Sequence, residues 1–422
     1  MAYIYRANSS ASGTTATISA WVKSVKTDHD AGIFQFKSSS NTISFYTNPI
    51  LKFRVYTSGG YSTGDLVANN RKFRDFGGWW HLVATIDTTN ATSGDRLRIY
   101  INGERHTDFT TETYPSQNQS YAQLVSGNFE LGKYSATDRT TYLAHVHYCD
   151  GYAYNADSFG STDATTGQWK INTNPNVQYG SNGVFLKFAS AGALGTDSSG
   201  NNNTMSISGT ALQTQDNPSN NFCTWNPLKK LTVTLSNGNT TTSGNGDNGV
   251  WGTIGDNQGK WYWETQQNAG NTMMGAIRED VQQTTGRSDQ AGVYGVQDGT
   301  TYAYYRNNGS SGQSSGFAQI TNSAVLCHAL DLDNGKYYLG VNGNFTNLSG
   351  TASNISSGTN PTFSGLDTTK FWFPFTECRG NGAGCDANFG NGFLGTTAIS
   401  SAGTNASNLG NFEYDVPAGF AA

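Results

Sequence analysis

Apolar and polar residues alternate in short runs along this chain. The pattern of an amphipathic helix, with apolar residues three or four positions apart, is nearly absent. In Leu97-Arg98-Ile99-Tyr100-Ile101 the aliphatic side chains fall on one face of an extended segment. Asn102-Gly103 follows at once, and this dipeptide favours a two-residue hairpin turn because both positions require positive φ. The pattern predicts antiparallel strands joined by tight turns, with further strands at residues 80–87 and 142–148.

The second half of the chain repeats this pattern. Residues 325–333 form a long strand-like run, and Asn334-Gly335 predicts the turn after it. Residues 336–341 then form a second run, which ends at Asn342-Gly343. We therefore expect an all-β chain of two tandem antiparallel β-sandwiches with nearly no helix.

Composition supports this fold class and excludes several functions. The chain has 51 Gly, 22 Tyr and 22 Phe, which suits many strands joined by polar turns. The net charge of −5 argues against nucleic-acid binding. No apolar run is long enough to span a bilayer, and the N-terminus lacks the features of a signal peptide. We expect a protein that is made in the cytoplasm of its host and released by another route.

The cysteine count is odd and sparse, which argues against a disulfide framework. Cys378 and Cys385 could pair across a Gly-rich turn, but reduced thiols are the favoured interpretation.

Three segments are expected. Residues 1–160 form the first sandwich, and residues 230–422 form the second, with a docked strand at its C-terminal end. Residues 161–229 are interpreted as an ordered, extended connector that packs on the first domain, because Phe222, Trp225 and Leu228 can pack.

The first domain resembles the concanavalin A-like, laminin-G-type jelly rolls. The matching segments are Ile18-Ser19-Ala20-Trp21-Val22-Lys23, Trp80–Asp87, Leu97–Ile101 with Asn102-Gly103, and Phe129-Glu130-Leu131-Gly132. This resemblance implies glycan binding. It also implies a structural calcium ion near the ligand loops, for which Asp28, Asp30, Asp87 and Asp150 are candidate ligands; no cofactor is otherwise required.

The segment after residue 150 is similar to a block found in structural proteins of tailed phages. Its pieces are Asp150-Gly151-Tyr152-Ala153, Phe159-Gly160, Thr166-Gly167-Gln168-Trp169, Tyr179-Gly180-Ser181-Asn182-Gly183, Asp197-Ser198-Ser199-Gly200-Asn201 and Asn220-Asn221-Phe222. This similarity implies a bacteriophage virion protein.

The second domain resembles the SPRY (B30.2) sandwich. The matching segments are Gly259-Lys260-Trp261-Tyr262-Trp263-Glu264, Met274-Gly275-Ala276-Ile277, residues 330–343, Phe371-Trp372-Phe373-Pro374-Phe375 and Asn388-Phe389-Gly390. This resemblance implies binding to protein or peptide surfaces, although fold alone does not decide the ligand.

Glycoside hydrolysis would need two carboxylates on either side of the scissile bond. The chain has only seven Glu and no two are close in sequence. Glu264 and Glu377 are the pair that could converge in space, but a solvent-side position on a strand is the favoured interpretation of Glu264. We therefore predict that the protein is not an enzyme.

Two patterns resemble metal sites. Asp331-Leu332-Asp333 with Asn334-Gly335 is similar to the start of a calcium loop, but it lacks the later Glu, so a hairpin turn is favoured. His145-Val146-His147 has a spacing that can bind zinc, but no third ligand is evident. Two solvent-side histidines are the favoured interpretation.

Sugar recognition needs exposed aromatic rings beside hydrogen-bonding groups. The candidate ligand-binding residues are Trp251, Tyr302, Tyr304 and Arg306, which lie in or beside polar, Gly-rich stretches. Packing or interface roles are the alternative for each. Trp21, Trp80, Trp261 and Phe373 are expected in the core.

These observations favour a virion surface protein of a bacteriophage, as a head fibre, a decoration protein or a tail-fibre component. Its expected partners are other virion proteins, in the capsid or the tail, and host cell-surface polysaccharide. We expect a homo-oligomer, with a trimer as the working assumption. The alternatives are a glycan depolymerase on a concanavalin-type fold and a cellular lectin, which would need an export signal.

Overall fold

The computed structural model describes residues 2–25, 31–47, 50–57, 61–73, 75–134, 137–138, 141–281, 292–297, 303–307, 310–314, 320–321 and 324–422. For residues 61–62, 137–138, 292–297, 303–307 and 310–314 it describes the backbone alone. The fold is all-β, as predicted: helix is confined, in these ranges, to α1 (Ala122–Ser126) and three short 3-10 turns, η1 (Ser93–Asp95), η2 (Ala156–Ser158) and η3 (Asn237–Asn239). No helix in the described ranges is long and apolar enough to cross a membrane.

The chain forms two compact units. One comprises Met1–Gln213 and Asn217–Ser219, and the other Thr214–Asp216 and Asn220–Ala422. The connector expected at residues 161–229 is therefore divided between them. Its first part belongs to the first unit, whereas Trp225 is fully buried in the second.

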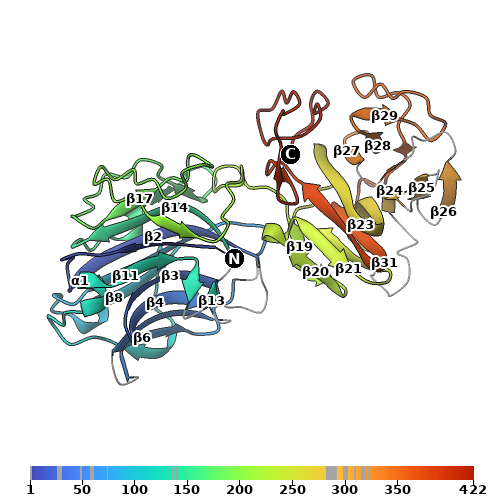
Figure 1. Cartoon of the computed structure of the whole chain (residues 1–422). Coiled ribbons are helices and arrows are strands. Elements are labelled where there is room, and N and C mark those ends of the chain that lie inside the picture. Colours follow the sequence, from blue (N-terminus) through green and yellow to red (C-terminus); the bar gives the residue numbers. More distant parts are fainter. Residues whose placement is uncertain are drawn as a thin grey trace. The chain divides into compact units, whose positions relative to one another are not determined.

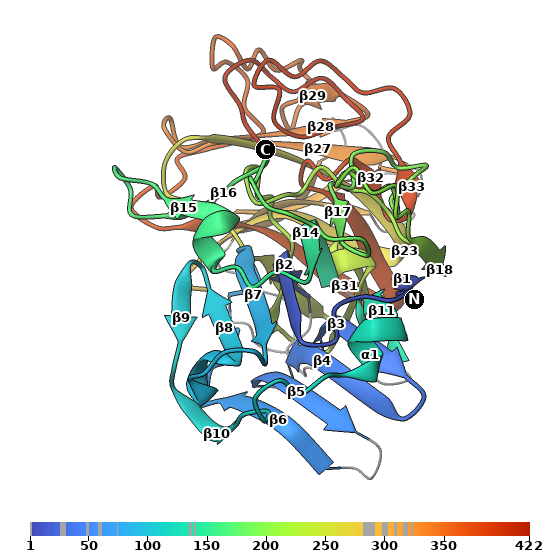
Figure 2. The ribbon, with the colours of Figure 1, turned by 90° about the vertical axis from the view of Figure 1, so that its left-hand side faces the viewer.

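The first unit contains two large antiparallel sheets (Figures 1 and 2). The eight-stranded sheet has the order β10 (Phe109–Thr113), β6 (Tyr61–Ala68), β5 (Leu51–Thr57), β4 (Asn41–Thr47), β3 (Ala31–Ser38), β11 (Asn128–Leu131), β1 (Tyr3–Ala7) and β18 (Ser206–Ser208). The six-stranded sheet has the order β17 (Val184–Leu186), β14 (Thr141–Asp150), β2 (Thr15–Ser24), β7 (Trp80–Asp87), β8 (Leu97–Ile101) and β9 (Glu104–His106). Two small hairpins are β12 (Lys133–Tyr134) with β13 (Thr137–Asp138), and β15 (Gly160–Thr162) with β16 (Trp169–Ile171).

Alternate side chains of these two sheets meet in one core. Ile18, Ala84 and Ile99 come from the six-stranded sheet and join one apolar cluster with Phe34 and Phe53 of the eight-stranded sheet. All five are buried. The alternation of side chains along each strand therefore separates this apolar core from an outer face on each sheet.

The outer face of the six-stranded sheet is covered by the chain that follows β14. Val83 and Cys149 on the sheet pack with Phe159 and Val177 of the covering segment. Asp150 fixes the base of that segment, because its carboxylate accepts hydrogen bonds from the backbone N–H of Ser12 (2.7 Å) and of Asn182 (3.2 Å). The block that resembles phage proteins thus begins as a cover for this sheet.

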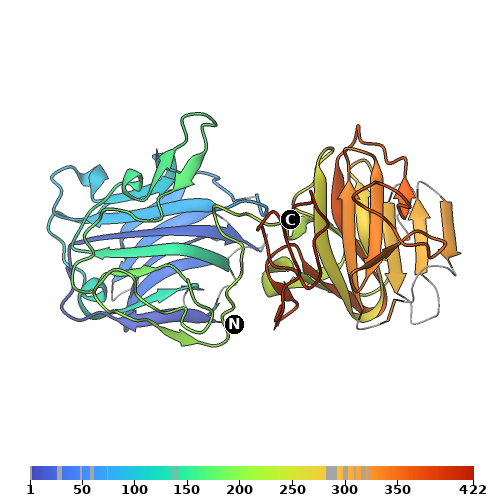
Figure 3. The same cartoon turned by 90° about the horizontal axis from the view of Figure 1, so that it is seen from above.

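The second unit is built around two long strands, β23 (Lys260–Arg278) and β31 (Trp372–Asn388), whose neighbours appear as yellow to red strands in Figure 3. Its main sheet has the order β19 (Trp225–Lys230), β22 (Asn248–Gly252), β31, β23, β27 (Val325–Asp331), β28 (Lys336–Val341) and β29 (Asn344–Thr346). The strands that pair off this path are β20 (Val233–Ser236), β21 (Thr241–Gly244), β24 (Gly292–Gln297) and β30 (Phe363–Ser364). Separate hairpins are β25 (Ala303–Asn307) with β26 (Ser310–Ser314), and β32 (Phe393–Leu394) with β33 (Thr397–Ala398).

Strand β31 folds over near its middle, and this makes a sandwich from one continuous sheet. Cys385 Sγ lies 3.3 Å from Thr376 Oγ1, although an extended strand would separate the two residues by about 30 Å. Gly380 and Gly382, between them, have φ values of 94° and 69°, which favour glycine. Cys378 and Cys385 both lie buried in the core as free thiols.

The C-terminal segment docks on the outer face of β23, β27 and β28. Phe412, Val416 and Phe420 are buried against a surface that includes Tyr262 and Tyr338. The segment is not the regular strand that was expected, because it is held by isolated bridges such as Trp261 with Ala421.

Candidate functional site

A row of polar residues crosses the outer face of the eight-stranded sheet in the first unit. Its members stand directly opposite one another on six neighbouring strands, in the order β1, β11, β3, β4, β5 and β6. They are Tyr5, Glu130, Gln35, Ser44, Arg54 and Asp65. At least one neighbour of each along its strand lies in the core, so strand alternation places all six on the other face. We call these six residues the polar row; Figure 2 shows five of its strands, β11 and β3 to β6, side by side.

The members of the polar row are largely paired with one another. The Gln35 amide donates to the Glu130 carboxylate, and Lys133 Nζ lies 3.7 Å from the same carboxylate. Arg54 Nε donates to Asp65 Oδ1 at 2.9 Å. Burial raises the pKa of Asp65, and the Arg54 charge opposes that rise.

Ser44 is the exception in the middle of the row. Its side chain is 1% exposed, and its hydroxyl has no hydrogen-bond partner within the part of the chain that the structure describes. A buried hydroxyl without a partner costs about 1–3 kcal/mol of folding free energy. Other buried polar atoms of the described residues are in the same state, such as Trp21 Nε1 and Trp263 Nε1, so this feature alone does not indicate a ligand.

Tyrosines and cations flank the polar row. The rings of Tyr46 and Tyr134 stack at 3.7 Å between centroids, and Lys133 Nζ lies 3.8 Å from the centre of the Tyr3 ring. Arg54 also donates to the Tyr56 hydroxyl at 2.9 Å. Tyr46 is buried, whereas Tyr3, Tyr56 and Tyr134 are half-buried. Half-buried rings beside oriented donors and acceptors are groups that bind the faces and hydroxyls of sugars.

The residues predicted to bind sugars lie elsewhere. Trp251 is fully buried in β22 and packs edge-on against Phe375, so it has no exposed face that a sugar could contact. The prediction that Trp251 binds a ligand is therefore wrong. Tyr302 lies outside the described residues. Tyr304 and Arg306 lie on β25, opposite Gln313 and Ser311 of β26, and their side chains are outside the description. Of the expected core residues, Trp21 is buried, whereas Trp80, Trp261 and Phe373 are half-buried.

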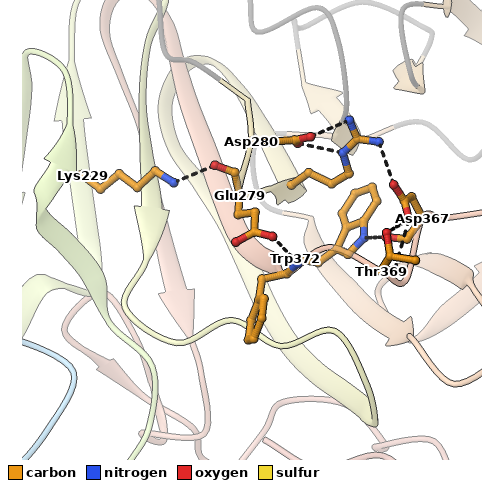
Figure 4. A network of polar contacts seen from close by, with 8 residues as sticks. Lys229, Glu279, Asp280, Asp367, Thr369 and Trp372 are labelled. Atoms are coloured by element: carbon orange, nitrogen blue, oxygen red, sulfur yellow. Dashed lines mark hydrogen bonds and ion pairs between the residues drawn. The ribbon is translucent and has the colours of Figure 1, made fainter.

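Figure 4 shows a polar network that includes Lys229, Glu279 and Asp367. Lys229 Nζ lies 4.8 Å from the centre of the Trp251 ring and donates to the backbone carbonyl of Glu279 at 3.4 Å. Burial lowers the pKa of Lys229. On the same side of the unit, the Trp372 indole donates to the Asp367 carbonyl at 3.0 Å. These contacts join the ends of strands, and we assign them a structural role.

Glu264 does not face solvent as predicted; it is fully buried under the C-terminal segment. Its carboxylate accepts hydrogen bonds from the backbone N–H of Glu413 (2.9 Å) and of Tyr414 (2.8 Å). The Tyr262 hydroxyl (3.0 Å) and the Asn388 amide (3.1 Å) donate to it as well. Burial raises the pKa of Glu264, and these four donors oppose the rise.

Glu377 does not complete a catalytic pair with Glu264. It is buried on β31 opposite Met273, which packs in a cluster with Trp251 and Phe375. Glu264 instead lies between Tyr262 and the C-terminal segment, in a different cluster. The two carboxylates therefore do not flank a common space.

The histidine pair is also placed differently from the prediction. His147 is buried, with its ring stacked on Phe185 at 4.0 Å and Nδ1 2.9 Å from the Tyr179 hydroxyl. His145 has a φ of 43° at an irregularity in the pairing of β14 with β2. This bulge breaks the strict alternation of faces, so the expectation of two solvent-side histidines is wrong for His147.

The acidic candidates have structural partners. Asp331 closes the turn between β27 and β28, where it accepts from Asn334 N (3.1 Å) and pairs with Lys260 Nζ (2.9 Å), so the predicted hairpin is confirmed. Asp87 accepts from the Thr89 hydroxyl at 2.6 Å. Asp28 and Asp30 lie outside the described residues. Within the described ranges, no three His, Cys, Asp or Glu side chains are grouped to hold a metal.

Comparison with known proteins supports the fold class. Residues 2–138 include the whole polar row and every strand of the eight-stranded sheet except β18. They match the family model described as the Concanavalin A-like lectin/glucanases superfamily. None of the curated protein sequences matches the chain.

Three solved structures are similar at low identity. The SPRY domain of human HERC1 is 15% identical, with 39% of this chain and 96% of that chain covered and a TM-score of 0.29. The TRIM65 PSpry domain is 13% identical, covers 39% of this chain and 91% of that chain, and has a TM-score of 0.30. The heptameric SAP-like pentraxin from Limulus polyphemus is 15% identical, covers 37% and 72%, and has a TM-score of 0.28.

Removing the charge of Glu264 should destabilise the second unit. In Glu264→Gln the amide NH2 would face backbone N–H donors, so we expect a loss of about 2–4 kcal/mol in the free energy of unfolding. Urea unfolding of the full chain measures this loss. The exposed Glu104→Gln on β9 is the matched control and should leave stability unchanged. Equal stability of both variants would contradict the role assigned to Glu264.

Acid should destabilise both units through buried imidazoles. Burial lowers the pKa of His81 and of His328 to about 3. Between their ordinary pKa of about 6.5 and this value, each imidazole takes up a proton only in the unfolded chain, so stability is lost as pH falls. Each histidine should contribute up to about 1.4 kcal/mol per pH unit in that window.

Urea unfolding between pH 7 and pH 4 tests this dependence. The variants His81→Gln and His328→Gln are expected to be less stable but to show a shallower dependence on pH, because glutamine does not titrate. An unchanged slope in both variants would assign the acid sensitivity to other groups.

Proposed function

We propose that this protein is a non-enzymatic surface protein of a tailed-phage particle and that its first unit binds glycans of the host surface. The observation that carries the glycan part is the polar row on the outer face of the eight-stranded sheet, where Arg54 and its neighbour Tyr56 are half-buried. The match of residues 2–138 to the concanavalin A-like superfamily supports the same proposal, because that superfamily includes lectins.

The proposal that the protein is not an enzyme rests on its carboxylates. Glu264 has four hydrogen-bond donors around it, and two of them belong to the segment that buries it. Hydrolysis would require a carboxyl group that reaches a substrate and a second one nearby. In the polar row, Glu130 and Asp65 stand four strands apart, at a separation of about 19 Å, which exceeds the spacing of either hydrolytic mechanism.

The virion part of the proposal rests on sequence similarity. The block that starts at Asp150 is similar to one in tailed-phage structural proteins, and it supplies the cover of the six-stranded sheet. A display protein also needs contacts with neighbouring virion proteins, which we propose for surfaces away from the polar row. We propose a homo-oligomer, because closed symmetric assemblies are usual for repeated surface parts.

Arg54→Ala should weaken glycan binding. The substitution removes a charged donor from the polar row, so we expect at least a fivefold loss of affinity for any glycan that the full chain binds on an array of host envelope polysaccharides. Arg105→Ala is the matched control, because Arg105 forms a comparable surface ion pair with Asp95 (2.7 Å) on the edge of the other sheet. An equal loss of affinity in both variants would show that the glycan does not bind at the polar row. Release of soluble sugar from the polysaccharide would contradict the non-enzymatic part.

Mass spectrometry of purified phage particles tests the location. We expect peptides of this chain at a copy number that matches a repeated surface component. Their absence from intact particles, together with their presence in the infected-cell lysate, would refute the virion assignment and leave glycan binding to be judged separately.

A further inference from the structure

The hairpin formed by β15 and β16 belongs to the segment that covers the six-stranded sheet, and its own contacts stabilise its turn (Figure 2). Residues 161–168 are exposed, apart from the half-buried Asp163. The Asp163 carboxylate accepts a hydrogen bond from Thr166 N (2.8 Å) and pairs with Lys170 Nζ (2.5 Å). These two are the only charged residues from 160 to 171, so the hairpin carries no net charge.

Among the described residues, one hydrogen bond joins a side chain of this hairpin to the six-stranded sheet. The Trp169 indole Nε1 donates to His81 Nδ1 on β7 at 3.0 Å. The Trp169 ring also packs against Gly103 in the turn after β8, where an added Cβ would lie 2.5 Å from the ring. These two contacts fasten the hairpin, and we call it docked while the hydrogen bond to His81 is formed.

The partners of His81 decide which of its nitrogens carries a proton. An indole N–H can only donate a hydrogen bond, so Nδ1 has to accept it and carries no proton. The proton of the neutral imidazole is then on Nε2, which lies 2.8 Å from Ser19 Oγ and donates to it. A second proton would sit on Nδ1, where it would face the indole N–H of Trp169. The docked hairpin is therefore incompatible with a charged His81.

The surroundings of His81 also disfavour a charge. The side chain is fully buried, and its ring stacks on Trp21 of β2 at 4.9 Å between centroids. Burial lowers the pKa of His81 to about 3, and no carboxylate raises it. A charge on His81 would in turn lower the pKa of His147. The titratable and charged residues on the elements around His81 are Lys23 on β2, Arg98 and Tyr100 on β8, His147 and Cys149 on β14, Asp157 in η2 and the Asp163–Lys170 pair of the hairpin.

We infer that the contact between Trp169 and His81 is an acid-sensitive latch, which holds the hairpin docked at neutral pH and releases it when His81 takes up a proton. Release would open the Trp169 ring, and the sheet surface around His81 and Trp21, to solvent. The protein would then present an aromatic surface in acid that it conceals at neutral pH. This inference does not depend on what the polar row binds.

The direction of the pH dependence follows from the two states of His81. In the released state His81 is open to water and takes up a proton near its ordinary pKa of about 6.5. In the docked state it does so only near 3. Acid therefore favours release, and the ratio of docked to released hairpin should fall by up to about tenfold for each pH unit between these two values.

The second unit contains a buried histidine that serves as an internal control. His328 also stacks on a tryptophan, Trp263, at 4.9 Å between centroids. Its nitrogens face two hydroxyl groups, those of Thr265 (2.7 Å) and Tyr337 (2.6 Å). A hydroxyl can donate or accept, so both hydrogen bonds can persist when this imidazole is charged. Only His81 faces a partner that cannot reverse its role.

The experiment is fluorine NMR of the full chain labelled with 5-fluorotryptophan, from pH 7.5 to pH 4, in H2O and in D2O. The variants Trp169→Phe and Trp263→Phe assign the two resonances. We expect the Trp169 resonance to gain the solvent isotope shift of an exposed indole as pH falls below 6.5, while the Trp263 resonance and the far-UV circular dichroism stay unchanged. A Trp169 resonance that changes only when all nine tryptophan resonances change together would overturn the inference.

Two further variants test the role of His81 itself. His81→Asn offers the indole an oxygen acceptor near the position of Nδ1 but takes up no proton, so the Trp169 resonance should stay docked down to pH 4. Ser161→Ala, at an exposed position of β15, is the matched control and should keep the wild-type transition. A wild-type transition in His81→Asn would assign the release to another group and overturn the latch.

A second measurement covers the case in which His81→Asn does not fold. Trp169→Phe removes the indole N–H that opposes protonation of Nδ1, so the midpoint of the His81 titration, followed by NMR of the imidazole, should rise by at least one pH unit. The midpoint of His328 should not move in this variant. An unchanged midpoint of His81 would show that Trp169 and the proton do not compete, and would overturn the inference.

Discussion

A strand sends its side chains alternately to two faces, and the first unit depends on what the two faces of its eight-stranded sheet carry. Gln35 lies between Phe34 and Phe36, which are both buried in the core. A shift of one residue in the register would exchange the aromatic face for the polar one, so the core holds the strands in place. The packing of the phenylalanines is therefore what fixes the spacing of the polar row.

The two units share an arrangement that their sequences only suggest. The order β14, β2, β7, β8, β9 in the first unit corresponds to the order β31, β23, β27, β28, β29 in the second. In both, an Asn at the end of a strand accepts a backbone hydrogen bond: Asn102 from His81 N (2.8 Å) and Asn342 from Val325 N (2.9 Å). In both, the chain that follows the first strand of this order covers the outer face. Those two faces are therefore occupied by the protein itself.

Sequence patterns predicted the local elements well, because alternation and turn chemistry are local properties. Asn102 and Gly103 have φ values of 47° and 86°, and Asn342 and Gly343 have 50° and 80°, as the predicted turns require. The strand that follows Trp79 and the one around Val146 were also predicted. These elements establish the sandwich architecture, but they do not show which residues lie together on each face of a sheet.

The candidate site could not be predicted, because it depends on cross-strand register. Gln35, Ser44 and Arg54 each stand alone between apolar residues in their own strands, which is the signal that sequence analysis could have used. Nothing in the sequence places them opposite one another. Burial was misjudged for the same reason: His147 follows a bulge, and Glu264 is covered by residues far along the chain.

The contact between Glu264 and Tyr414 joins residues that are 150 positions apart in the sequence. During synthesis, the carboxylate and the apolar face around Tyr262 leave the ribosome long before the segment that covers them. A nascent chain therefore carries an uncovered sheet face until Phe412, Val416 and Phe420 have emerged. The second unit can complete its folding only after that point, so ribosome pausing within the intervening stretch would prolong an aggregation-prone state.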